Sequence, residues 1–148
     1  MRTPTDVLRS EHEVILRALA LLEVAAARPA GAEPPDDWWE RAGDWLRWFA
    51  DRSHHAKEER SLFPALIKAG LSSPGGPVDV LLEEHADARA LVRAMRGAPA
   101  AARAARRYVA LLRRLIDKEN GVLFPLAEAL LDERAMAAAD LAAGLGVR

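Results

Sequence analysis

Apolar residues recur every three or four positions in two segments of the chain, and each apolar stripe contains one histidine. In residues 4–27 the stripe surrounds His12, and in residues 78–95 it surrounds His85. This spacing is typical of the buried face of a bundle helix. A histidine within such a face needs a partner, because burying an imidazole without one costs about 1–3 kcal/mol. The apolar members of the two stripes are Leu8, Ile15, Leu19 and Leu22 in the first, and Val78, Leu81, Ala88, Val92 and Met95 in the second.

Proline and glycine separate the periodic segments and define the expected helices. We expect helices over about 4–27, 36–62, 78–95 and 100–123, with Thr3 as the first N-cap and Gly70 as a stop signal. Pro64 and Pro125 should kink or interrupt their helices, and a last helical stretch should cover about 126–143. The short loops favour an all-α, up-down-up-down four-helix bundle with an extra C-terminal helical segment, forming a single domain over residues 1–148.

Polar side chains interrupt the buried faces of the other two expected helices as well. His54 and Glu58 lie four residues apart, and therefore on one helix face. His55 and Glu59 repeat this spacing, rotated by about 100°, and Glu119 lies in the apolar stripe of the fourth helix. Each helix thus sends an imidazole or a carboxylate inward at a similar level. This arrangement indicates a metal site suited to iron, manganese or zinc, with satisfied core histidines and solvated helix pairs as the alternative.

Composition narrows the choice of chemistry. The chain has 148 residues, four histidines, no cysteine and a net charge of -1. The lack of cysteine excludes a disulfide scaffold, a zinc ribbon, an iron–sulfur cluster and a thiol nucleophile. The charge gives no support to nucleic-acid binding. No apolar run is long enough to cross a membrane, and no secretory signal is visible, so we expect a cytoplasmic protein.

Two sequence blocks resemble the hemerythrin-like HHE cation-binding domain family. They read HHAKEERSLFP over residues 54–64 and IDKENGVLFP over residues 116–125. Glu-His pairs stand at residues 11–12 and 84–85, and the resemblance covers roughly residues 5–131. It implies a four-helix bundle with a carboxylate-bridged diiron centre that binds or senses dioxygen, nitric oxide or peroxide, or handles iron. The ligands it implies are His12, His54, Glu58, His85 and Glu119.

One position departs from the family pattern. The family places a histidine four residues before the last glutamate, where this chain has Leu115. The resemblance then leaves three outcomes: a diiron site with one labile position, a single ion, or a fold without metal. His55 could donate a hydrogen bond to a ligand, be exposed, or replace the missing ligand. Tyr108 could hydrogen-bond to a ligand or act as a phenolate ligand.

The glutamates beside the expected ligands have two interpretations. Glu11, Glu59 and Glu84 are either exposed partners of arginine or acceptors for the N–H groups of the ligating histidines. Four tryptophans lie near the start of the second helix. We expect Trp45 and Trp48 to pack inward and Trp38 or Trp39 to cover the bundle end, with homodimerisation through this surface as a further prediction.

Three functions stay open. The first is an iron-dependent binding or sensing protein, rather than an enzyme, that takes a small diatomic or peroxide ligand and neither nucleic acid nor membrane. The second is a diiron enzyme that decomposes peroxide. The third is a metal-free interaction module that retains the bundle.

Overall fold

The first helix, α1, begins where the sequence predicts. The computed structural model describes residues 3–97, 100–132 and 134–136, and α1 spans Pro4–Ala26. The Thr3 side chain accepts a hydrogen bond from the Asp6 N–H, and the Asp6 carboxylate accepts one from the Thr3 N–H. This reciprocal cap satisfies two N–H groups that have no partner within the helix, so the predicted N-cap at Thr3 is confirmed.

The second long helix changes its hydrogen-bonding pattern along its length. It consists of α2 (Asp36–Leu46), two π-helical segments, η1 (Arg47–His55) and η2 (Glu58–Leu62), and α3 (Phe63–Lys68). The interruption expected at Pro64 is wrong, because the helix runs without a break from η2 into α3, in whose first turn this proline lies. The chain leaves the helix at Gly70, whose φ is 112°, as the sequence predicts.

The second half of the chain repeats this construction. It contains α4 (Pro77–Ala94), α5 (Ala100–Lys118), η3 (Glu119–Leu123) and α6 (Phe124–Leu130). Pro125 lies in the first turn of α6 and does not interrupt the helix either. The expected C-terminal helical segment is therefore α6, a direct continuation of α5 and η3. It ends before Leu131, whose backbone is extended. Residues 134–136 are again helical, and residues 137–143 of the prediction lie outside the described part.

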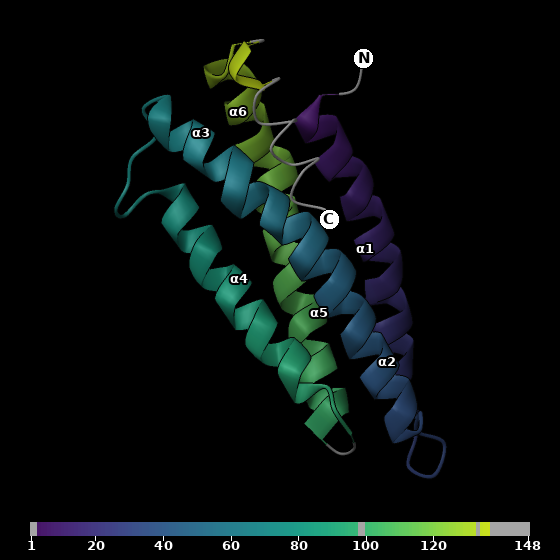
Figure 1. The fold of residues 1–148 in the computed structure, drawn as a ribbon. Helices are drawn as coiled ribbons and strands as arrows, with labels where there is room; N and C mark the ends of the chain where they lie inside the picture. The colour runs from purple at the N-terminus through teal and green to yellow at the C-terminus, as the bar shows by residue number, and fades with distance from the viewer. Residues whose placement is uncertain (1–2, 98–99, 133, 137–148) are drawn as a thin grey trace.

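The long helices form an all-α bundle in which each helix runs next to its sequence neighbour (Figure 1). Helix α5 packs on both α1 and α4, and η1 contacts α1 and α4. The apolar core has two parts. One lies towards the α1–α2 loop and contains Ile15 and Leu19, and the other lies towards α3 and α6 and contains Leu8 and Leu62. The level between these parts is that of His12, which follows Leu8 and precedes Ile15 on one helix face.

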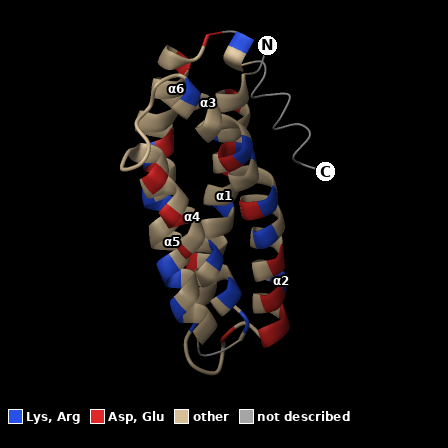
Figure 2. Ribbon diagram, turned by 60° about the vertical axis from the view of Figure 1, so that its left-hand side comes forward, with Lys and Arg blue, Asp and Glu red and all other residues tan. Residues whose placement is uncertain are grey.

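Charged residues of both signs are interspersed over the outer surfaces of the helices (Figure 2). Among the described residues, no helix is both long and apolar enough to cross a membrane.

Candidate metal centre

Six buried imidazole and carboxylate side chains form a polar layer between the two parts of the apolar core. They come from α1, η1, η2, α4 and η3, and the exposed fraction of each residue is at most 1%. The structure therefore brings all five sequence-predicted ligands to one level of the bundle, together with one histidine that the prediction left undecided. The polar layer consists of His12, His54, His55, Glu58, His85 and Glu119.

The two carboxylates of the polar layer lie between imidazoles on either side. The Oε1 atom of Glu119 is 2.9 Å from His12 Nε2, and its Oε2 atom is 3.5 Å from His85 Nε2. The Oε1 atom of Glu58 is 3.5 Å from His54 Nε2 and 3.6 Å from His85 Nε2. Each carboxylate thus faces histidines from both hairpins of the bundle, which is the placement that a bridging ligand requires.

Two groups of candidate ligand atoms share Glu58, and within each group all ligand atoms lie within 4.8 Å of one another. We call the group on the α1 side the first half-site, and the group on the α4 side the second half-site. The members of the first are His12, His54, Glu58 and Glu119, and those of the second are His55, Glu58 and His85.

Carboxylates outside the polar layer orient two of the histidines. The Nδ1 atom of His54 is 2.9 Å from Glu11 Oε1, and Lys57 also contacts Glu11. Burial would raise the pKa of Glu11, but the hydrogen bonds from His54 and Lys57 outweigh it and lower that pKa. The ionised Glu11 can only accept, so Nδ1 of His54 carries the proton and its Nε2 atom presents a lone pair to the polar layer.

His85 is held in the same way. Its Nδ1 atom is 2.7 Å from Glu59 Oε2, and Arg89 also binds Glu59. Glu11 and Glu59 are therefore acceptors for histidine N–H groups, which was one of the two interpretations of the sequence. Glu84 accepts from Lys118 instead.

An amide orients the remaining predicted histidine. The Nδ1 atom of His12 is 2.7 Å from the carbonyl oxygen Oδ1 of Asn120. Because that oxygen can only accept, Nδ1 of His12 is the donor, and Nε2 faces Glu119. Three histidines on three helical segments thus direct Nε2 into the polar layer. Sequence reasoning did not assign this role to Asn120, although its place beside Glu119 in the KEN string was visible.

The electrostatics of the layer disfavour two bare carboxylates. Burial and the neighbouring Glu119 raise the pKa of Glu58 well above its usual value. Burial acts on Glu119 in the same direction, but its hydrogen bond with His12 and the nearby His85 imidazole outweigh burial, and the pKa of Glu119 lies well below its usual value. A bound cation would offset the repulsion between these carboxylates and allow both to be ionised.

Several buried donor and acceptor atoms of the polar layer have no hydrogen-bond partner among the described residues. Each such atom costs about 1–3 kcal/mol if nothing satisfies it. These atoms belong to both half-sites, and imidazole nitrogens with carboxylate oxygens are a donor set that fits iron, manganese or zinc. The atoms are His54 Nε2, His55 Nδ1 and Nε2, Glu58 Oε1 and Oε2, His85 Nε2 and Glu119 Oε2.

Comparison with known families agrees with this geometry. The Hemerythrin HHE cation binding domain matches residues 3–127. The chain belongs to this family. Comparison with curated proteins gives no match.

The position at which the chain departs from the family pattern holds a buried apolar residue. Leu115 is fully buried and belongs to the apolar cluster that contains Phe63 and Leu81. Tyr108 is also buried. Burial raises the pKa of Tyr108, and the phenolate alternative stays a prediction.

His55 is buried, so the interpretation of His55 as an exposed residue is wrong. Its exposed fraction is 1%, and its ring stacks on that of His85 at a centroid distance of 3.8 Å. The π-helical backbone of η1 explains why two adjacent histidines both point inward. In η1 the Ala56 N–H donates to the carbonyl of Asp51, five residues back. Such a turn contains more residues than an α-helical turn, so the angle between neighbouring side chains is smaller than about 100°.

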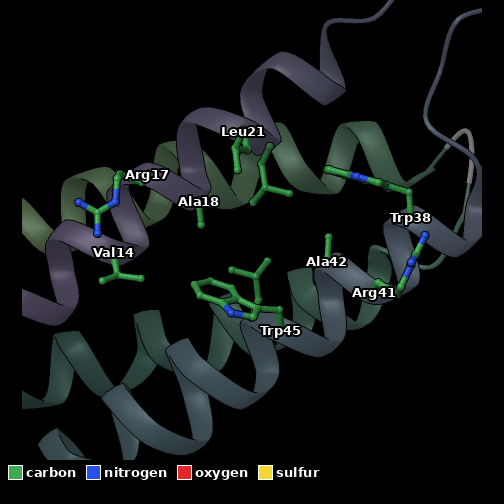
Figure 3. Close-up of a pocket in the computed structure, with 10 residues that line it drawn as sticks. Val14, Arg17, Ala18, Leu21, Trp38, Arg41, Ala42 and Trp45 are labelled. Carbon is green, nitrogen blue, oxygen red and sulfur yellow. The ribbon is translucent and has the colours of Figure 1, made fainter.

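One of the four tryptophans, Trp48, is placed differently from the prediction. Trp48 is 61% exposed, whereas Trp39 is 1% exposed, so the inward packing expected for Trp48 is wrong. Trp45 stacks on Phe49 and points from α2 towards α1 across a cavity of about 550 Å³ (Figure 3). Trp38 lines the other end of this cavity. Homodimerisation through this surface stays a prediction.

Proposed function

We propose that the protein is an iron-binding member of its family, holding a non-heme diiron centre in the polar layer and binding or sensing dioxygen, nitric oxide or peroxide. The observation that carries this proposal is the set of buried nitrogen and oxygen atoms that converge without hydrogen-bond partners in the described part of the chain. A bound diiron centre would supply reversible electron transfer to the small ligand.

The protein residues supply the donors, their orientation and their isolation from water. His12 and His54 would hold the ion of the first half-site, and His85 the ion of the second. Glu58 and Glu119 would bridge the two ions, since their oxygens face imidazoles of both half-sites. All five are buried, so the reacting ligand would meet the ions in an environment of low dielectric constant.

A cavity beside the second half-site is consistent with a small ligand. It measures about 210 Å³, and its walls include His55, Tyr108, Ala88 and Val92. A space of this size accommodates a diatomic molecule or peroxide. Because His55 lies in the second half-site and also in the cavity wall, the cavity offers a route to that half-site.

Two other functions fit the structure less well. A metal-free interaction module would have to keep two buried carboxylates and three buried histidines that have atoms without hydrogen-bond partners among the described residues. Each such atom lowers the stability of the fold by about 1–3 kcal/mol. Replacing such a layer by apolar residues would stabilise the fold. A peroxide-decomposing enzyme requires the same metal centre as the leading proposal. Only a measurement of peroxide turnover distinguishes the two functions.

Metal analysis with ligand titration tests the proposal. The protein is loaded with ferrous iron without oxygen, desalted, and assayed for iron per chain. We expect about two ions per chain and a change in visible absorption on adding dioxygen, nitric oxide or peroxide. Peroxide consumption above that of free iron would favour the enzyme. A chain that retains no iron and whose unfolding temperature is unchanged by ferrous iron would refute the proposal.

A further inference from the structure

We propose that His55 is the second imidazole ligand of the second half-site and takes the place of the ligand that the family pattern puts at Leu115. This inference rests on the proposed metal centre. It assigns to the chain a ligand that the sequence comparison does not, because the imidazole comes from a neighbour of His54 and not from α5.

The position of the imidazole is the first argument. One ring nitrogen of His55 lies within 4.8 Å of ligand atoms of Glu58 and His85. The rings of His55 and His85 stack with an interplanar angle of 13°. In the first half-site, the rings of His12 and His54 are likewise adjacent, with a centroid distance of 4.6 Å. With His55 included, each half-site has two neighbouring imidazoles beside the shared Glu58.

The bonding state of His55 is the second argument. Both of its ring nitrogens are buried, and neither has a hydrogen-bond partner among residues 3–97, 100–132 and 134–136. A core histidine kept for packing would be expected to place at least one nitrogen on a partner. The imidazole is thus positioned to bind something that the protein itself does not supply.

The surroundings of His55 are the third argument. Its Nδ1 atom is 4.0 Å from Asp51 Oδ1, and Arg89 Nε donates to the same oxygen at 2.7 Å. Arg89 also binds Glu59, the acceptor for His85. One guanidinium therefore holds the two carboxylates that stand behind the two imidazoles of the second half-site. At 4.0 Å the Asp51 oxygen is too far from His55 Nδ1 for the hydrogen bond that Glu11 makes with His54, but it places a carboxylate on the Nδ1 side of the ring.

The local backbone explains how an imidazole from η1 can replace one from α5. The π-helical turn of η1 allows His54 and His55 to point into different half-sites, although they are consecutive. On α5, the corresponding space one turn before Glu119 is filled by Leu115 and its apolar neighbours. Removing one imidazole from α5 and adding one from η1 keeps four histidines around Glu58 and Glu119.

Iron stoichiometry in matched variants tests the assignment. We compare the wild type with His55→Leu, which removes both ring nitrogens, and with His55→Phe, which keeps a ring against His85. We expect about two ferrous ions per chain in the wild type and about one in each variant. The double variant His55→Leu/Leu115→His returns an imidazole to α5, and we expect it to regain the second ion.

The apo-protein provides a readout that a purely structural role would not give. Because His55→Leu removes two buried polar atoms that lack partners, we expect apo His55→Leu to unfold at the same temperature as the wild type or higher. A packing role would lower the unfolding temperature of both single variants. X-ray absorption at the iron edge counts imidazole ligands per iron, and we expect this average to be equal in wild type and double variant.

Four results would overturn the assignment. If His55→Leu and His55→Phe both keep two ions, His55 is not a ligand, although the proposed function stands. If the wild type holds a single ion, the second half-site is not loaded, and iron binding still stands. If the double variant stays at one ion, the positions 55 and 115 are not equivalent. If the wild type holds none, the proposed function itself fails.

Discussion

The two half-sites share Glu58 but obtain their imidazoles in different ways. The first takes His12 and His54 from two antiparallel helices, and each has a short Nδ1 contact to a separate partner, Asn120 or Glu11. The second takes His85 from α4 and, by our proposal, His55 from the same turn as His54. Its outer carboxylates both depend on Arg89. Similar donor sets can therefore arise from different local backbones.

The half-sites also differ in their carboxylate–imidazole distances and in their access to a cavity. Glu119 lies within hydrogen-bonding distance of His12 at 2.9 Å, but its contact with His85 is 3.5 Å. The cavity of about 210 Å³ reaches the second half-site through His55. This difference predicts that the ion of the second half-site exchanges faster and is the one that meets an incoming ligand.

The largest expected effect comes from removing what the half-sites share. Glu58→Gln keeps the size of the side chain but abolishes the anionic bridge, so we expect both ions to be lost. Iron per chain after ferrous loading is the measurement, and Glu13→Gln, on the exposed face of α1, is the matched control. A Glu58→Gln protein that keeps two ions would show that the half-sites do not depend on this carboxylate.

Removing one imidazole of the first half-site should have half that effect. His54→Leu leaves the second half-site intact, so we expect one ion per chain, by the same assay. The retained ion should still respond to the small ligand, because the cavity reaches His55 rather than His54. If His54→Leu loses both ions, the half-sites load as one unit and the comparison between them does not hold.

The outer carboxylates should have smaller effects that are confined to one half-site each. Glu11→Gln weakens the orientation of His54, and Glu59→Gln that of His85, so each should lower the affinity of its own ion by about 10–100-fold. Competition with a metal chelator measures both affinities. Glu84→Gln serves as the control, because the contact of Glu84 is with Lys118. Equal weakening of both ions by Glu11→Gln would contradict separate half-sites.

The smallest change concerns the amide behind His12. Asn120→Asp replaces this acceptor by a carboxylate, as found behind His54 and His85. A carboxylate acceptor raises the basicity of the imidazole, so we expect a few-fold tighter binding in the first half-site, measured by the same competition. Unchanged affinity would show that the first half-site does not depend on the charge of its outer partner.

Much of the fold could be predicted because its signals are local. The N-cap at Thr3 and the stop at Gly70 depend on a few neighbouring residues, and both are confirmed. The inward placement of His12 and His85 followed from apolar periodicity. Periodicity assumes a constant angle per residue, and this assumption fails in η1. The interruptions expected at Pro64 and Pro125 were wrong, and a π-helical turn precedes each proline.

The sequence alone determined the helical bundle, the family and the five residues that meet at its centre, because regular spacing and a local motif carry that information. Only the tertiary structure decided the fate of His55 and Trp48. In η1 the number of residues per helical turn changes, and the directions of neighbouring side chains depend on how this segment packs against α1 and α4. No local sequence pattern records that packing. Packing of those helices thus placed a fourth imidazole beside His85 and left Trp48 at the surface.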